Sequence, residues 1–230
     1  MNDKIIGIIG GMGPEATAEL YMKIIKATKV NRDQDHFRVI IDSNPKIPDR
    51  TQAILNNGES PVEAIVETAK NLEKLGVNIG CLPCITSHYF IEEIQKQVSF
   101  KILNALEELN IYLKDNYPQV KNIGILATTG TIKTNLFNKY LPDFNIVYVD
   151  STTQSEKVME AIYGEGGIKR GNTEGKPLKL LIEASQELVD KGAEIIVAGC
   201  TEITLALKSH NINNPLVDPM DVVAKSIVKF

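Results

Sequence analysis

The feature that most constrains the fold of this chain is a segment that occurs twice, each time ending in a cysteine. The first copy runs from residue 72 to Cys84 and the second from residue 188 to Cys200, with leucine, glycine and cysteine at equal spacings. Each copy reads as the end of a helix, a glycine that terminates it, a buried strand and then a thiol. Ligands bind where the strands of an open parallel sheet end, so both thiols are candidate functional groups.

The repeat extends beyond the two cysteine segments. Residues 4–13 resemble residues 121–130 at an offset of 117, and residues 20–23 resemble residues 136–139 at an offset of 116, which also separates the cysteines. The alternative is chance, because any two strand–helix–strand units share glycines and apolar positions. The common offset favours a duplicated half-molecule.

Short apolar runs rich in β-branched residues alternate with helical patterns along the whole chain. The predicted strands are residues 5–9, 39–41, 77–82, 123–126, 146–149 and 195–198. This alternation predicts an α/β fold of two pseudo-symmetric, doubly wound parallel-sheet lobes, with the active site in the cleft between them. We expect residues 1–98 with 209–230 to form the first lobe and residues 99–208 to form the second.

Composition excludes several classes of function. The net charge of −4 over 230 residues provides no basic footprint for nucleic acid. No apolar run approaches about 20 residues, so no membrane span is expected, and the first residues do not read as a signal peptide. Three cysteines favour free thiols in a reducing cytoplasm. No pair of histidines or acids has the spacing of metal ligands, so no metal is expected.

The two strand-end cysteines suit proton transfer. A following helix N-terminus is expected to lower the pKa of each thiol. One thiolate and one thiol, on opposite faces of a carbon, supply the base and the acid that stereochemical inversion needs. Repulsion between two thiolates favours the state with a single proton on the pair. The plainer alternative for either residue is a buried, inert cysteine.

Two other motifs leave alternatives open. Residues 11–16 fit the pattern G-x-G-x-x-A of dinucleotide-binding turns, with Asp42 at the end of the next predicted strand, although the same N–H groups suit a carboxylate. Cys81 and Cys84 resemble a redox pair, but Cys81 falls inside the strand. His88 either orients a thiol or caps a helix.

Three further segments could hold a carboxylate group. Arg50 follows a turn and leads into a helix, where its guanidinium can pair with a carboxylate through two hydrogen bonds. The turn Thr128–Gly130 offers hydroxyl and N–H groups at a predicted helix start. Lys169 lies in a glycine-rich segment, residues 164–172, that we interpret as a candidate lid.

Together these segments resemble the aspartate/glutamate racemase family, whose enzymes work without pyridoxal phosphate, and most closely its aspartate racemase branch. The similarity spans nearly the whole chain in order. It rests on residues 10–17, 47–51, 83–88, 126–132, 162–163, 168–169 and 199–202. The resemblance implies two α/β lobes with a cleft between them, no cofactor, and a homodimer.

The resemblance also implies roles for individual residues. Cys84 and Cys200 would be the two acid/base thiols. The substrate contacts would come from Met12, Gly13, Arg50, Thr86, Thr128, Thr129, Gly130, Lys169 and Thr201. The family reads Pro-Cys-Asn-Thr at the first thiol, whereas Ile85 stands in place of that asparagine here. Ile85 supplies no amide to hold the substrate.

We therefore expect a cytoplasmic, homodimeric racemase that inverts an acidic amino acid, aspartate first, by proton transfer between two cysteines. Its partner is a small dicarboxylic amino acid, and neither nucleic acid nor membrane is expected. One alternative is an isomerase or decarboxylase of the same fold that acts on another small dicarboxylate. Others are a catalytically weak carboxylate-binding protein and a dinucleotide-dependent enzyme.

Overall fold

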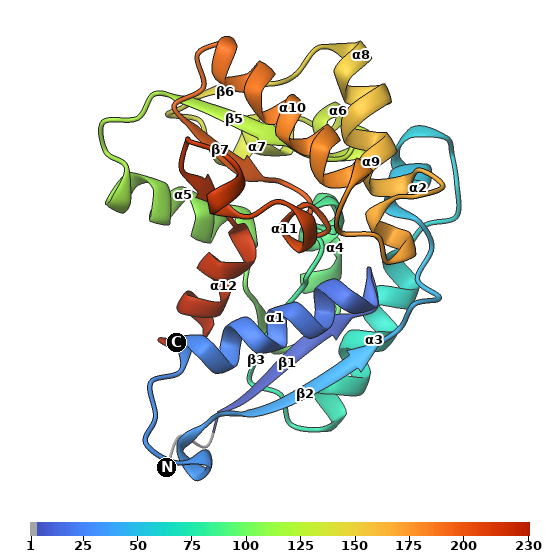
Figure 1. Cartoon of the computed structure of the whole chain (residues 1–230). Coiled ribbons are helices and arrows are strands. Elements are labelled where there is room, and N and C mark those ends of the chain that lie inside the picture. The colour runs from blue at the N-terminus through green and yellow to red at the C-terminus, as the bar shows by residue number, and fades with distance from the viewer. Residues whose placement is uncertain (1–3) are drawn as a thin grey trace. The chain divides into compact units, whose positions relative to one another are not determined.

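The computed structural model describes residues 4–230, and the chain divides into two compact units (Figure 1). One unit comprises the residues up to Leu109 together with Met220–Phe230, and the other comprises Asn110–Pro219. Each unit contains a four-stranded sheet in which every described strand pair is parallel. The predicted α/β class with two parallel-sheet lobes is confirmed.

The first sheet has the strand order β2-β1-β3-β4. Its strands are β1 (Ile5–Gly10), β2 (Arg38–Ser43), β3 (Ile79–Cys81) and β4 (Lys101–Ile102). The α-helices of this unit are α1 (Pro14–Ala27), α2 (Arg50–Leu55), α3 (Val62–Lys74), α4 (Ile91–Gln95) and α12 (Pro219–Ile227), with short 3₁₀ turns η1 (Asp33–Asp35) and η2 (Thr86–Phe90). Helix α5 (Ala105–Asn116) leads into the second unit.

The second sheet has the order β6-β5-β7-β8, which repeats the first order when strands are taken along the chain. Its strands are β5 (Asn122–Leu126), β6 (Asn145–Val147), β7 (Ile195–Ala198) and β8 (Leu216–Val217). Around them lie α6 (Thr129–Lys133), α7 (Leu136–Tyr140), α8 (Ser151–Thr153), the π-helical turn η3 (Gln154–Met159), α9 (Glu160–Tyr163), η4 (Ile168–Arg170), α10 (Lys176–Asp190), α11 (Ile203–Ala206) and η5 (Ser209–Asn211).

The first strand of each sheet along the chain, β1 or β5, carries a glycine against which neighbouring side chains pack closely. A Cβ atom on Gly7 of β1 would lie 2.7 Å from Val77 and 3.2 Å from Leu72. A Cβ atom on Gly124 of β5 would lie 2.9 Å from Ala193 and 3.1 Å from Leu188. Distances this short leave no room for a side chain. The two glycines and their leucine neighbours occupy corresponding places in the sequence repeat, so the duplication extends to core packing.

The boundaries between the units differ from those expected at residues 98 and 208. Strand β4 pairs with β3, so the chain stays with the first sheet past residue 98, and the division falls at Leu109. Strand β8 pairs with β7, which keeps the chain with the second sheet as far as Pro219. Helix α12 then returns to the first unit. Across residues 4–230, no helix combines the length and apolar character needed to cross a bilayer.

Candidate active site

Both candidate thiols follow the carboxyl end of the corresponding strand in their own unit. Cys84 comes three residues after the end of β3, and Cys200 comes two residues after the end of β7. Strand β3 pairs in parallel with β1, and β7 pairs in parallel with β5. In each unit the loop after β1 or β5 therefore leaves from the same end of the sheet as the thiol.

The backbone at Cys84 is fixed by two side-chain hydrogen bonds. The carbonyl oxygen of Cys84 accepts one from Ser87 Oγ at 2.7 Å and one from His88 Nδ1 at 2.9 Å. The other ring nitrogen, Nε2 of His88, accepts from the N–H of Ala105 at 3.0 Å. Because Nε2 accepts, the ring is neutral with its proton on Nδ1.

His88 has a structural role in this arrangement. Burial lowers the pKa of His88 to about 4, although its hydrogen bonds to the backbone act in the opposite direction. The ring remains neutral at physiological pH and links η2 to the start of α5. With both ring nitrogens hydrogen-bonded to the backbone, it positions the loop that carries Cys84.

On one side Cys84 packs into the apolar core of the first unit. Cys84 belongs to one buried cluster with Met12, Ile47 and Leu82, and Met12 is only 2% exposed. The side chain of Ile85 is also enclosed, with 1% of its surface exposed. The predicted contacts Met12 and Cys84 thus come together within the first unit, and Ile85 fills a core position.

Arg50 occupies the first position of α2, after its N-cap residue Asp49. The side chain is buried, and its Nη1 donates hydrogen bonds to the carbonyl oxygens of Pro48 at 2.9 Å and Ile47 at 3.3 Å. Helix α2 contacts η2, the turn that contains Thr86. The guanidinium is therefore held by its own loop, on a helix that contacts the segment following Cys84.

Two alternatives from the sequence lose support. Burial raises the pKa of the Cys81 thiol to about 12, and its Sγ lies 3.7 Å from the carbonyl oxygen of Gly7 inside the sheet. An enclosed, protonated thiol is a poor redox partner for Cys84. In the glycine turn, the N–H of Gly11 donates to Thr17 Oγ1 at 2.9 Å, and a Cβ atom on Gly11 would lie 2.3 Å from the backbone of Asn44. Gly11 thus serves the close approach of two loops.

In the second unit, Cys200 belongs to a charged cluster that spacing alone did not reveal. Its Sγ donates to Oε2 of Glu202 at 2.9 Å, and Thr201 Oγ1 lies 3.3 Å from the same oxygen. The other carboxylate oxygen of Glu202 accepts a hydrogen bond from Nζ of Lys169. Cys200, Thr201 and Glu202 are all buried. One carboxylate therefore joins the thiol to the lysine of the glycine-rich segment.

The expectation of a lowered pKa at Cys200 is wrong. Burial and the negative charge of Glu202 raise the pKa of this thiol well above its ordinary value, and the Lys169 ammonium offsets them only in part. Helix α11 after Cys200 has four residues, so its dipole is small. Burial would raise the pKa of Glu202, but Lys169 and the Cys200 thiol lower it overall. Cys200 therefore holds its proton in this state.

Lys169 is anchored by the short turn η4. Its neighbour Ile168 is buried in the same apolar cluster as Cys200, and Lys169 Nζ lies 5.4 Å from the centre of the Tyr163 ring. Gly171 ends the turn with φ of 89°, a left-handed conformation that favours glycine. In this structure the glycine-rich segment packs onto the core beside Cys200.

The turn after β5 is ordered by a glutamine that sequence reasoning missed. Thr128 caps α6, since its Oγ1 accepts from the N–H of Thr131 at 3.3 Å. Gln154 Nε2 donates to the carbonyl oxygen of Ala127 at 2.9 Å and to Thr129 Oγ1 at 3.3 Å. Gln154 is 8% exposed and lies 25 residues after Thr129. Only the fold brings these residues together.

The site residues thus fall into two sets, one in each unit. The predicted contacts in the first unit are Met12, Gly13, Arg50, Cys84, Ile85 and Thr86, and those in the second are Thr128, Thr129, Gly130, Lys169, Cys200 and Thr201. Among residues 4–230, no three histidine, cysteine, aspartate or glutamate side chains group as metal ligands would.

Two units of equal strand order, each with a thiol after an inner strand, define a class of duplicated α/β proteins. The model of the Asp/Glu/hydantoin racemase family matches residues 9–227. The chain belongs to this family, and the resemblance seen in the sequence is confirmed. Amino-acid racemases of this family are enzymes that work without pyridoxal phosphate.

Individual relatives cover nearly the whole chain. The broad specificity amino-acid racemase RacX of Bacillus subtilis is 29% identical over 228 residues, which cover 97% of this chain and 96% of that protein. The structure of an aspartate racemase from Picrophilus torridus is similar with a TM-score of 0.81 and 28% identity, over 98% of this chain and 93% of that one. A glutamate racemase from Francisella tularensis shares the fold, with a TM-score of 0.65 at 19% identity over 100% and 81% of the two chains.

Proposed function

We propose that this enzyme inverts the α-carbon of an acidic amino acid, aspartate first, by proton transfer between Cys84 and Cys200. The observation that carries the proposal is the matched position of the two thiols, each after the equivalent strand of its own sheet. The relative from Picrophilus torridus is described as an aspartate racemase, which supports this substrate. The description of the Bacillus subtilis relative as broad in specificity supports testing a wider panel.

In the proposed reaction one cysteine is a thiolate and the other a thiol. The thiolate takes the α-proton, the electron pair of the broken C–H bond moves into the adjacent carboxylate, and the second thiol donates its proton to the opposite face. No oxidant or reductant is needed, and one proton stays on the pair. Burial and the charge of Glu202 keep the proton on Cys200 at the outset, so Cys84 is assigned as the first base.

Charge development on the substrate carboxylate requires stabilising groups. We assign this role to the N–H and hydroxyl groups of the Thr128–Gly130 turn and to Thr86 and Thr201. Arg50 and Lys169 are the cations proposed to bind the carboxylates. The cytoplasmic location and the homodimer stay predictions.

The test is exchange of the α-hydrogen in deuterated water, followed by mass spectrometry and chiral chromatography for L- and D-forms of aspartate, glutamate and alanine. The wild type should incorporate deuterium into aspartate and yield both enantiomers. Cys84→Ala and Cys200→Ala should each abolish racemisation, whereas Cys81→Ala should retain most of it because Cys81 is enclosed in the sheet.

Two outcomes would overturn the proposal. Near wild-type racemisation by either Cys84→Ala or Cys200→Ala would remove the two-thiol mechanism. Stabilisation by a dicarboxylate with no exchange of any acidic amino acid would favour a carboxylate-binding protein instead.

A further inference from the structure

We propose that the first unit carries a second ligand site, remote from Cys84, that takes a nucleoside di- or triphosphate. The proposal rests on two neighbouring cavities, one basic and one aromatic. They lie where α1 ends and β2 begins, at the amino ends of the parallel strands. The candidate thiol follows the carboxyl end of a strand, on the opposite side of the sheet's length. The racemase mechanism uses none of the residues that line them.

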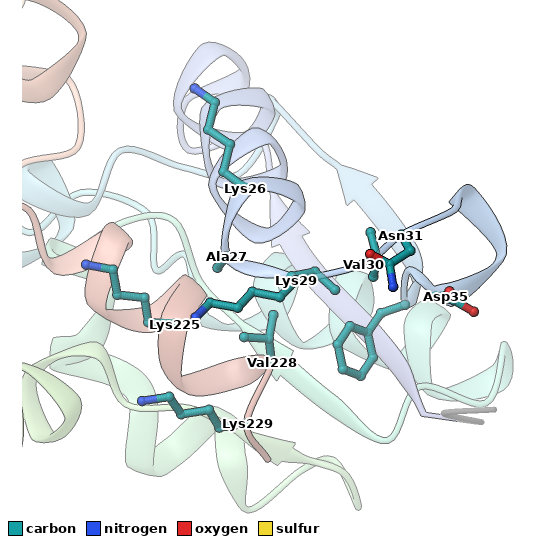
Figure 2. Close-up of a pocket in the computed structure, with 11 residues that line it drawn as sticks. Lys26, Ala27, Lys29, Val30, Asn31, Asp35, Lys225, Val228 and Lys229 are labelled. Atoms are coloured by element: carbon teal, nitrogen blue, oxygen red, sulfur yellow. The ribbon is translucent and has the colours of Figure 1, made fainter.

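The larger cavity has a volume of about 900 Å³, within the range of small-molecule sites. It lies between the carboxyl ends of α1 and α12 and the loop that leads into β2 (Figure 2). An ion pair of 2.7 Å between Lys23 of α1 and Asp221 of α12 joins these two helices. The cavity is therefore framed by elements of the first unit alone.

Four lysines line this cavity, although the whole chain has a net charge of −4: Lys26, Lys29, Lys225 and Lys229. The acid in the lining is Asp35, whose carboxylate already accepts a hydrogen bond from Arg32 Nε at 3.0 Å. The cavity therefore carries a clear excess of positive charge.

Part of this charge is explained by the helices, and part is not. A helix carboxyl end bears roughly half a negative charge, which a lysine in the last turn offsets. Lys26 lies in the last turn of α1, and Lys225 in the last turn of α12. Lys29 and Lys229 lie beyond the helix ends, so their charge exceeds what the dipoles require. A ligand with several negative charges would compensate this excess.

Figure 2 shows how these side chains are disposed. Lys29, Lys225 and Lys229 extend toward the same side of the view around Val228, while Lys26 points away from them. Lysine ammonium groups bind phosphate as point charges with rotatable donors. Three such groups suit a short phosphate chain better than a single carboxylate.

The smaller cavity, of about 350 Å³, adjoins the basic one because both are lined by Thr28 and Phe37. Tyr21, His36 and one acid, Asp33, also line it, and Tyr21 is 37% exposed. Aromatic faces stack on nucleic-acid bases of any sequence. A flat base against these rings, with its phosphates among the lysines, fits both cavities at once.

Helix α1 separates this site from the catalytic residues. From Pro14, beside the predicted contact Gly13, the helix runs seven residues, or about 10 Å, to Tyr21 in the lining of the smaller cavity and 13 residues, or about 20 Å, to Ala27 in the lining of the basic cavity. A bound nucleotide would therefore leave the substrate contacts of Met12 and Gly13 uncovered. Its binding can be measured independently of racemisation.

The experiment is calorimetric titration of the full chain with ATP, tripolyphosphate and adenosine in metal-free buffer at low and physiological salt. ATP should bind most tightly, tripolyphosphate more weakly, and adenosine weakest of all. The double variant K29Q/K229Q should weaken ATP and tripolyphosphate by at least about tenfold. Tyr21→Ala should weaken ATP alone, since tripolyphosphate has no base to stack.

A matched control removes two exposed lysines of the second unit, in the double variant K133Q/K179Q. Equal losses of ATP affinity in K133Q/K179Q and K29Q/K229Q would reduce the effect to net charge and overturn the site. Equal binding of ATP and tripolyphosphate would overturn the assignment of a base-binding cavity, and absence of ATP binding at about 1 mM would overturn the whole proposal. Thermal unfolding and circular dichroism of each variant check that the fold is intact.

Discussion

The contact between Cys200 and Glu202 makes a quantitative prediction for the variant Glu202→Gln. The carboxylate oxygen lies 2.9 Å from the thiol, and both groups are buried. Removing the carboxylate charge eliminates its repulsion of the thiolate and leaves the Lys169 ammonium to attract it. The pKa of Cys200 should therefore fall in the variant.

The expected size follows from Coulomb's law. Two unit charges about 4 Å apart interact by about 4 kcal/mol at an effective dielectric constant of about 20. Reorientation of the amide and of Lys169 reduces this value, but a remaining 1.4 kcal/mol already corresponds to a tenfold change in the thiolate population. We expect alkylation of Cys200 near neutral pH to accelerate at least about tenfold.

The assay is the rate of alkylation by iodoacetamide as a function of pH, measured by mass spectrometry of the Cys200 peptide. A background of Cys81→Ala and Cys84→Ala leaves Cys200 as the one remaining thiol of the chain. Glu156→Gln, at an exposed acid of the same unit, controls for the loss of one negative charge. Glu202→Asp should keep the wild-type direction because it keeps the charge.

A pH midpoint of alkylation that is unchanged or moves upward in Glu202→Gln would show that the Glu202 charge does not hold the proton on Cys200. A faster rate at every pH, with the same midpoint, would show only that the substitution opens access to the thiol. Because the readout is alkylation, its outcome does not depend on whether the substrate is aspartate.

Three other substitutions test single contacts. Folding lowers the pKa of His88 from 6.5 to about 4, so its contribution to the free energy of unfolding is complete above pH 6.5 and falls by about 3 kcal/mol as the pH drops toward 4. In urea unfolding at several pH values, His88→Asn should lower stability near neutral pH and flatten the dependence of stability on pH, and an equally steep dependence would contradict this. Arg50→Ala should raise KM for aspartate far more than for alanine, whereas equal changes would make Arg50 structural. Ile85→Asn should improve kcat/KM for aspartate roughly tenfold if the amide reaches the substrate, while burial of the amide lowers the free energy of unfolding by about 1–3 kcal/mol. Unchanged kinetics with lower stability would give Ile85 a role in core packing alone.

The positions of Cys84 and Cys200 could be predicted because they depend on local signals that recur along the chain. A glycine after a helix and a short apolar run fix where a strand ends, and the repeat supplied this information twice. The same signals were too weak for β4 and β8, which have two residues each. Missing these strands displaced the expected boundaries between the units.

The chemistry of Cys200 could not be predicted in the same way. Its proton is controlled by Glu202 and, through that carboxylate, by Lys169, which lies 33 residues away from Glu202 in sequence. The sequence shows charged residues but not which of them meet inside a core. A rule based on helix ends therefore gave the wrong direction, since desolvation dominates for a thiol that is 6% exposed.

The return of α12 to the first unit affects the order in which the protein completes its fold during synthesis. Ion pairing of Asp221 with Lys23, and a cation–π contact of 4.9 Å between Lys101 and Phe230, join the last residues to segments made much earlier. The second unit is continuous from Asn110 to Pro219, so all of its strands emerge before α12 does. On the ribosome, the half-molecule that is made first is therefore the one that is finished last.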